Sequence, residues 1–376
     1  MYCCVLQRDP AMEEAMNATW SLRWNVTDEP LNMIETAMNY SDNRSLIERA
    51  VHEACITWHP VQNFILPLVY VVVLFVGLFG NFIALLIFLQ NAWKIKKAIR
   101  VYLINLTLAD ITFNATLPFW VVYYFKGGDW IFSEAMCRMA GVFYYVATYS
   151  AMTFMILISI NRYCTVRMTK LPIPLNEPTG SLYTCGFVWM FWLACGIPAL
   201  MQRQTNRWGL NATRCFEEYS DRRSYVYASF VFFLISFLFV LLSYISIMKA
   251  LSSQGNALKG IHRRLARSMV LGMLIVFLVC VLPYHLSLIP WELSRANSKE
   301  AAGCSPLKGI DIVHKLNLAL LSMNSCVDPI IYCFSVKRFR RELNKIFRKL
   351  VRRLPFQPHT IEPSETHIRS NSLTTS

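Results

Sequence analysis

Charged residues are scarce in this sequence. They make up 16% of the 376 residues, whereas an average soluble domain carries about 25%. Hydrophobic residues make up 55%, and the mean hydropathy is +0.36. This balance argues against a soluble protein and predicts an integral membrane protein. The net charge is +14, but the basic residues gather in short segments between apolar runs, a distribution that argues against nucleic-acid binding.

Several other features are missing. The first thirty residues contain no apolar core of signal-peptide length, so the first long apolar run would have to act as its own insertion signal. The chain has no internal repeat, and seven runs do not divide into inverted halves, which disfavours a transporter. A channel or transporter would also need a continuous polar path. No nucleophile–base or metal-ligand spacing is present, so we expect no enzyme, no metal site and no cofactor.

Seven long apolar runs are the main feature that is present. Most are long enough for a helix of about 20 apolar residues, which is the length that crosses a bilayer. They predict an all-α membrane protein, a seven-transmembrane helix bundle, rather than a lipid-facing β-barrel. The runs lie near 62–90, 99–125, 135–163, 182–202, 224–249, 267–291 and 311–334.

Polar segments flank the predicted bundle, which occupies 61–335. Residues 1–60 form a polar tail with four glycosylation sequons, which favours an extracellular segment. Residues 336–350 predict a short amphipathic eighth helix along the inner leaflet. Residues 351–376 predict a disordered cytoplasmic tail, which is either a phosphorylation substrate or a tail without that role. The predicted glycosylation sites are Asn17, Asn25, Asn39 and Asn43, with Asn211 between the fourth and fifth runs.

Basic connections alternate along the chain with connections of mixed charge. The connections after the first and the fifth run are basic and contain no acid, and the segment after the seventh run is strongly basic. The alternate connections mix both signs. Because positive charge favours the cytoplasmic side, this pattern predicts an extracellular N-terminus and a cytoplasmic C-terminus in the plasma membrane.

Charged side chains within the runs are expected to be functional. Asp110 lies in the second run, Arg162 at the end of the third and Asp328 in the seventh. An intramembrane carboxylate is costly and is therefore a functional hypothesis by default. The alternative is a static polar cluster that fixes helix packing. Four polar residues at comparable predicted depth could hydrogen-bond the aspartates: Asn81, Asn105, Asn324 and Ser325.

Cysteines and prolines add two further predictions. Cys137 and Cys215 both lie at the predicted outer face and can form a disulfide, and Cys55 and Cys304 form a second plausible pair. Prolines within the runs remove a helical hydrogen bond and can kink the helix. In the sixth and seventh runs, the kinks at Pro283 and Pro329 would also allow a helix to swing.

Aromatic residues gather at the outer ends of the predicted spans. Some would form an interfacial belt, but Tyr144 and Tyr145 cannot both face lipid. His285 could serve a ligand as a donor or, when protonated, as a cation. The alternative is a satisfied interhelical histidine. The aromatic set is Trp120, Tyr123, Tyr124, Phe143, Tyr144, Tyr145, Tyr225, Tyr227, Phe230, Tyr284 and Trp291.

Short motifs, one in each run, resemble those of the rhodopsin-like (class A) G-protein-coupled receptors over roughly residues 60–350. A single motif is weak, whereas the full set in order is very specific. The motifs are Gly80-Asn81, NLTLAD at 105–110, Asn161-Arg162-Tyr163, Trp189, Tyr244, Phe277 with Cys280-x-x-Pro283, and Asp328-Pro329-x-x-Tyr332.

Within that family the chain resembles the platelet-activating factor receptors. The resemblance is carried by LPFWVVYY at 117–124, NATRCFE at 211–217, Pro290-Trp291 and CVDPIIYCF at 326–334. It implies an ether phospholipid ligand with a phosphocholine head group. Its pocket would be lined by Trp120, Tyr124, Tyr144, Tyr145 and His285. Phe230, Tyr284 and Leu288 complete the predicted ligand set. Phe230 and Tyr284 stand where those receptors are expected to have histidines, and Leu288 replaces a glutamine.

The resemblance also implies a mechanism and partners. Ligand binding outside would activate a heterotrimeric G protein inside, with arrestin and receptor kinases acting on the Ser/Thr-rich tail. The switch residues carried over are Asp110, Arg162, Tyr244, Phe277, Pro283, Asp328 and Tyr332. The alternative within the family is a chemokine, peptide or nucleotide receptor, of which the Cys55–Cys304 pair is more typical.

Three positions depart from the family pattern. Asn161 stands where many relatives have an acid beside the arginine, and the base of the sixth run has no carboxylate. We therefore expect a weakly held closed state with measurable ligand-free signalling. Val281 occupies a position where many relatives carry tryptophan. Ala151 stands where relatives with a sodium site usually have a hydroxyl, which argues against a cation between Asp110 and Asp328.

Overall fold

The computed structural model describes residues 61–90, 97–167, 175, 177–208, 212–216, 223–252, 257–298, 309–335 and 337–351. All of them belong to one compact unit, Thr57–Ser376. Several predictions fall outside the described residues. They are the five glycosylation sites, the Cys55–Cys304 disulfide, the N-terminal tail and the C-terminal tail beyond 351.

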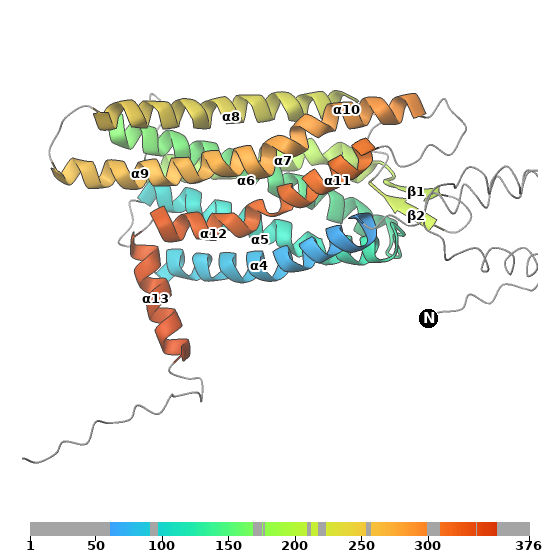
Figure 1. Ribbon diagram of the computed structural model, residues 1–376, viewed down its shortest axis with the longest axis horizontal. Helices are drawn as coiled ribbons and strands as arrows, with labels where there is room; N and C mark the ends of the chain where they lie inside the picture. The colour runs from blue at the N-terminus through green and yellow to red at the C-terminus, as the bar shows by residue number, and fades with distance from the viewer. Residues whose placement is uncertain are drawn as a thin grey trace, which may run out of the picture. The chain divides into compact units, whose positions relative to one another are not determined.

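Seven helical spans form the bundle, as predicted (Figure 1). The first is a π-helical turn η1 (Val61–Ile65) followed by α4 (Leu66–Gln90). The second to fifth are α5 (Lys97–Phe125), α6 (Glu134–Arg167), α7 (Pro178–Met201) and α8 (Arg223–Ser252). The sixth joins α9 (Ala257–Val276), η3 (Phe277–Val281) and α10 (Leu282–Ser298), and the seventh joins α11 (Gly309–Ser322) and α12 (Asn324–Ser335). β1 (Thr205–Trp208) and β2 (Ala212–Cys215) form a hairpin, and α13 (Lys337–Val351) follows the bundle.

Six of these spans, among the described residues, are long and apolar enough to cross a membrane. The remaining span is α5, whose sequence includes Asn105, Asp110 and Asn114. These polar side chains lower its hydropathy, but α5 packs between α4 and α6 in the bundle. The fold class is therefore the predicted one.

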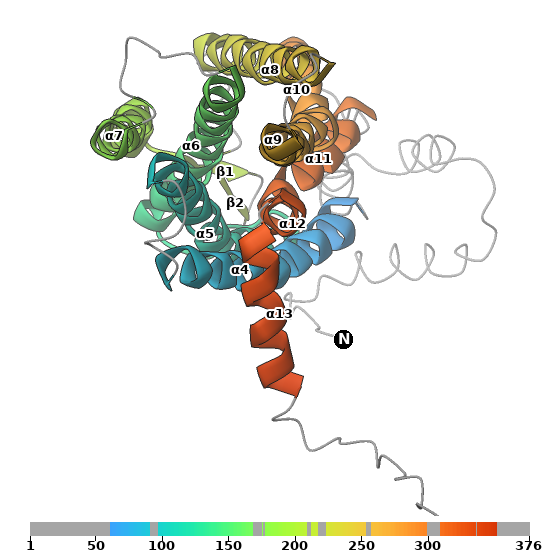
Figure 2. The ribbon, with the colours of Figure 1, turned by 90° about the vertical axis from the view of Figure 1, so that its left-hand side faces the viewer.

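The third span, α6, is the most enclosed. In its most apolar stretch 72% of the residues are buried, against 17% in α7. It contacts α5, α7, α8 and α9, and Figure 2 shows it between α5, α7 and α8. A helix with partners on so many sides has little surface left for lipid, which explains why it can carry polar residues along its length.

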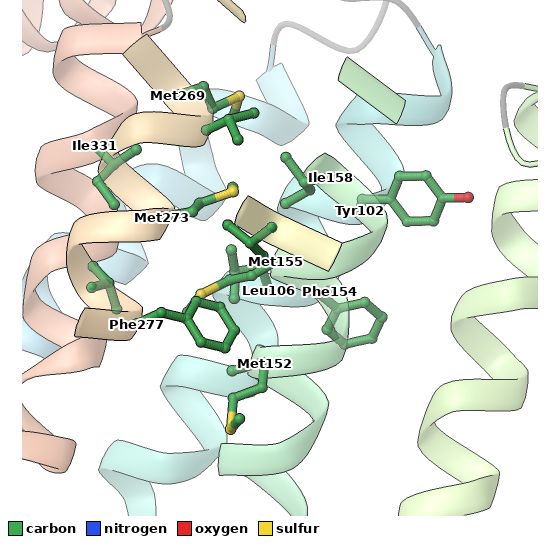
Figure 3. Close-up of a cluster of buried hydrophobic side chains, with 14 of the residues drawn as sticks. Tyr102, Leu106, Met152, Phe154, Met155, Ile158, Met269, Met273, Phe277 and Ile331 are labelled. Atoms are coloured by element: carbon green, nitrogen blue, oxygen red, sulfur yellow. The ribbon is translucent and has the colours of Figure 1, made fainter. Parts of the chain in front are cut away.

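Methionines fill much of the core between α6 and α9. Met152 and Met155 come from α6, and Met269 and Met273 come from α9 (Figure 3). All four side chains are at most 1% exposed. Methionine is unbranched and adapts its shape to irregular space, so this contact can be repacked with little steric resistance.

Two spans are interrupted near their prolines. In the sixth, the backbone N–H of Leu282 donates to the carbonyl of Phe277, five residues earlier, immediately before Pro283. In the seventh, the interruption is at Met323, six residues before Pro329, and α12 continues through that proline. The Asn81 side chain donates to the carbonyl of Ser325 at 2.7 Å, beside the interruption.

The helix α13 packs back on the bundle through one aromatic residue. Phe339 is 2% exposed, and its ring lies 5.7 Å from that of Phe88 and 6.0 Å from that of Tyr332. An apolar groove of about 510 Å³ runs between α4, α12 and α13. The predicted helix 336–350 corresponds to α13 within one residue. Its place on the inner leaflet stays a prediction.

Candidate functional site

A disulfide ties the hairpin to α6. Cys137, near the start of α6, bonds Cys215 at the end of β2, as predicted. The strands pair antiparallel from Thr205 opposite Cys215 to Trp208 opposite Ala212. The end of the bundle that carries this hairpin is called the hairpin end below, and the opposite end is called the α13 end.

Glu134 provides a second tether for the hairpin. Its carboxylate accepts hydrogen bonds from the backbone N–H groups of Gln204, at 2.7 Å, and Thr205, at 3.0 Å. The Thr205 hydroxyl also donates to it. Arg138, one turn further along α6, bonds the same carboxylate at 2.8 Å and the carbonyl of Leu200 at 3.1 Å. These charge-assisted bonds fix the entry to β1 over the start of α6.

Phe216 fits directly against α6. Its backbone φ is 61°, in the left-handed region that non-glycine residues rarely adopt. The side chain covers Gly141, where an added Cβ would lie 2.2 Å from the Phe216 ring. The ring also lies 6.0 Å from that of Tyr145. The hairpin therefore ends on the aromatic residues predicted to bind ligand.

Those aromatic residues form one connected group, which we call the outer aromatic cluster. Trp120 lies 6.0 Å from Tyr144, and Tyr144 lies 5.4 Å from Tyr145, between ring centres. Of the eight predicted ligand residues, Trp120, Tyr124, Tyr144, Tyr284, His285 and Leu288 are buried, whereas Tyr145 and Phe230 are half-buried. The described rings that α8 contributes to the cluster are Phe232 and Phe233. The cluster comprises Tyr70, Phe113, Trp120, Tyr124, Tyr144, Tyr145, Tyr149, Trp192, Phe232, Phe233, Tyr284 and His285.

Tyr149 is a central member that the sequence reasoning missed. Its ring stacks on Tyr145 at 6.5 Å and on Trp192 at 5.0 Å, and it meets His285 at 6.3 Å. It thus joins the part of the cluster near Trp120 to the part near α10. The signal in the sequence was its spacing of four residues from Tyr145, which places both on one face of a helix.

His285 is enclosed at the base of the cluster. It is 1% exposed, and its ring stacks on Phe233 at 4.6 Å and 15°. Its Nδ1 lies 2.9 Å from the carbonyl of Val281. Its Nε2 is buried and has no hydrogen-bond partner among the described residues.

A polar group at the hairpin end was also missed. His314 stacks on Trp291 at 4.2 Å and lies 3.2 Å from the Ser287 hydroxyl. The Trp291 Nε1–H donates to Asp311 at 2.7 Å, and the Lys315 ammonium bonds the Gln62 side chain. The seventh span therefore carries Asp311 and Lys315 in addition to the charged residues named from the sequence. Asp311, His314 and Lys315 are spaced three and four apart, which marks one face of a helix.

The two aspartates lie together in the middle of the bundle. Asp110 and Asp328 are each 1% exposed, and their carboxyl groups interact. The polar neighbours mostly bond elsewhere. Asn81 donates to backbone carbonyls, and the Asn105 side chain accepts a bond from Trp189 Nε1 at 3.0 Å. The predicted hydrogen bonds from these two asparagines to the aspartates are therefore not formed.

At the α13 end, Arg162 is held by no carboxylate among the described residues. Its Nε is buried without a hydrogen-bond partner there. The remaining predicted switch residues lie in the fifth, sixth and seventh spans. Phe277 and Tyr332 are fully buried, Tyr244 is half-buried, and the carbonyl of Pro283 accepts a bond from Asn317 at 3.0 Å.

Comparison with known proteins decides the family. Residues 80–332 match the seven-transmembrane receptors of the rhodopsin family. The chain belongs to this family. It is therefore a multi-pass membrane protein and a G-protein-coupled receptor, not an enzyme.

Individual relatives give the same assignment. The platelet-activating factor receptor of Mus musculus is 32% identical over 300 residues, which cover 75% of this chain and 85% of the relative. The receptor of the same name from Homo sapiens is 30% identical over 297 residues, with the same coverage. The G-protein coupled receptor 183 of Homo sapiens is 27% identical over 304 residues, covering 78% of this chain and 83% of the relative.

Proposed function

We propose that this receptor is activated by a lipid mediator, of the class of phospholipids that includes platelet-activating factor, bound from outside at the outer aromatic cluster. The observation that carries the proposal is the cluster itself. It is mostly buried, aromatic and contributed by six spans, and it lies under a hairpin held by Cys137 and Glu134. Small-molecule sites are mostly apolar with a few placed polar groups, which fits this composition. The similarity to platelet-activating factor receptors supports the same class.

The signal would travel along the sixth span. A ligand at Tyr284 and His285 contacts α10 within one turn of η3, where the helical hydrogen bonds are already shifted. The Asn317 bond to the Pro283 carbonyl links this point to α11. Beyond η3, α9 meets α6 through the methionines, which offer little resistance to repacking. Movement of α9 away from Arg162 would then open the α13 end to a heterotrimeric G protein.

A second candidate ligand class is a chemokine, peptide or nucleotide. The observation that favours it is the polar group around His314, with Asp311 and Lys315 at the hairpin end. Charged groups there suit a charged ligand better than an alkyl chain. The Ser/Thr-rich tail would in either case serve receptor kinases and arrestin.

The deciding experiment measures ligand-dependent guanine-nucleotide exchange. Membranes carrying the receptor and a panel of G proteins are treated with phospholipids, chemokines and nucleotides in parallel. We expect exchange with a phospholipid, without ion flux, and a loss of response in Tyr149→Ala. Tyr183→Ala, on the exposed face of α7, is the control and should respond normally. A response to chemokines or nucleotides alone would overturn the proposed ligand class.

A further inference from the structure

We infer that His285 presents a hydrogen-bond acceptor to the ligand, so that the activating lipid carries a hydroxyl or N–H donor at the base of the outer aromatic cluster. This inference rests on the proposed function and narrows it. It implies that the receptor responds more strongly to lipids with a free hydroxyl, such as lysophospholipids, than to the same lipids with that hydroxyl acylated or alkylated.

The first step concerns the position of the imidazole proton. Nδ1 lies 2.9 Å from the Val281 carbonyl, and a carbonyl oxygen can only accept. Nδ1 must therefore carry the proton. In a neutral imidazole the other nitrogen is then an acceptor only.

The second step concerns charge. The ring is 1% exposed and packs between Phe233, Tyr149 and Tyr284. No carboxylate bonds it among the described residues. An imidazolium here would be desolvated without a counter-ion, which is costly, so these surroundings stabilise the neutral ring. The sequence left open whether His285 serves as a donor or a cation; the geometry points to an acceptor.

The third step excludes the neighbouring hydroxyl groups as partners. The Tyr149 and Tyr284 hydroxyl groups do not bond Nε2. Nε2 is left buried without a partner in the described part of the chain. The ring that carries it contacts Tyr149 of α6 and Phe233 of α8. A buried acceptor without a partner is destabilising, and a ligand donor would relieve that penalty.

Trp120 provides the complementary group in the same cluster. Its Nε1–H is a donor only, it is buried, and it has no partner among the described residues. It would take an acceptor, such as a phosphate or carbonyl oxygen of the ligand. The cluster therefore requires a ligand with an acceptor at one point and a donor at another. Trp120 supplies a control, because its contribution should not depend on the ligand's hydroxyl.

The test uses two phosphocholine lipids that differ at one oxygen, 1-O-alkyl-lysoglycerophosphocholine and its 2-O-methyl ether. Nucleotide exchange is measured with wild type, His285→Phe and Trp120→Phe. We expect the lysolipid to be about tenfold or more potent on wild type. We expect the two lipids to be equally potent on His285→Phe, which keeps the aromatic stacking on Phe233. Trp120→Phe should weaken both lipids alike. Equal potency on wild type would overturn the inference but leave the proposed function standing.

A second measurement does not depend on the ligand or on the folding of a variant. In purified wild-type receptor with labelled histidine, ¹⁵N NMR distinguishes a protonated ring nitrogen from one with a lone pair. We expect Nδ1 of His285 to be protonated and Nε2 to be bare. A protonated Nε2 would overturn the inference. Silence toward both lipids, with a response to another phospholipid that has no donor group, would overturn the inference. Silence toward the whole phospholipid panel would overturn the proposed function, and the spectrum would still decide the role of His285.

Discussion

Gly141 lies where α6 passes closest to Phe216, the residue that follows the disulfide. An added Cβ would meet carbon atoms of that ring at 2.2 Å. We expect Gly141→Ala to destabilise the receptor by about 1–3 kcal/mol through overpacking, and to weaken ligand binding because Phe216 must move from Tyr145. Thermal unfolding and radioligand binding would show both effects. Gly186→Ala is the matched control, since nothing lies within 4 Å of its Cβ. An unchanged unfolding temperature for Gly141→Ala would contradict the geometry.

Glu134 acts on the same hairpin through hydrogen bonds rather than packing. Its carboxylate accepts from two backbone amides and from Arg138. We expect Glu134→Gln to raise hydrogen exchange at the amides of Gln204 and Thr205 about tenfold, because bonds to a charged acceptor contribute about 1.5–3 kcal/mol. Hydrogen exchange at the amides of α6 should not change. Unaltered exchange at these two amides would show that the disulfide alone holds the hairpin.

At the residue scale, the sequence predicts which residues have functional side chains better than it predicts where those side chains point. Trp120 and Tyr144 stood out because they belong to the aromatic set at the predicted outer ends of the spans, and His285 stood out because it is a titratable residue within one. Tyr149 and Phe233 did not, because the rotation of an apolar helix is set by its neighbours and not by its own sequence. The acceptor role of His285 depends on one distance, from Nδ1 to the Val281 carbonyl, which no pattern encodes.

At the scale of elements, the end of α6 that carries Arg162 should hold the inactive state weakly. Arg162 has no carboxylate partner among the described residues, and its neighbour is Asn161. We expect ligand-free nucleotide exchange above that of mock membranes, and we expect Asn161→Asp to reduce it. A gain of 1 kcal/mol for the closed state would lower the basal signal about fivefold. Asn161→Gln adds no charge and is the control. Wild type without basal exchange, at good surface expression, would contradict this.

Phe339 is the most deeply buried aromatic residue in the attachment of α13, and Leu343 packs on the core beside it. Phe339 is 2% exposed against Phe88 and Tyr332, whereas Phe347 on the same helix is 64% exposed. We expect Phe339→Ala to cost about 3–5 kcal/mol of local docking energy and to expose the amides of α13 to hydrogen exchange. Phe347→Ala should stay within about 0.5 kcal/mol of wild type. Equal effects of the two changes would mean that α13 is held by the membrane and not by the bundle.

The helices themselves were predictable, and their interruptions were not. Six of the seven runs gave a span within four residues at each end, because the bilayer requires about that length, whereas the sixth extends well beyond the predicted 267–291, from Ala257 to Ser298. Pro283 correctly marked an irregular turn in the sixth span. Pro329 did not mark the interruption in the seventh, which lies at Met323, where the Asn81 side chain bonds the Ser325 carbonyl. That bond joins positions 244 apart in sequence, so local propensity could not indicate it.

At the scale of the whole molecule, charge should set the orientation. The connections toward the α13 end carry basic residues and few acids, whereas the hairpin end carries acidic groups such as Glu134 and Asp311. Because Lys and Arg are retained on the cytoplasmic side, we expect an N-terminal epitope to be stained in intact cells and a C-terminal epitope only after permeabilisation.

Changing Lys94, Lys96 and Lys97 together to glutamine should increase the fraction of receptor with the C-terminus outside. Removal of N-linked glycans should lower the apparent mass of the correctly oriented protein, since Asn17, Asn25, Asn39 and Asn43 precede the first span. Staining of the C-terminal epitope in intact cells would contradict the orientation on which the ligand site and the G-protein site are both assigned.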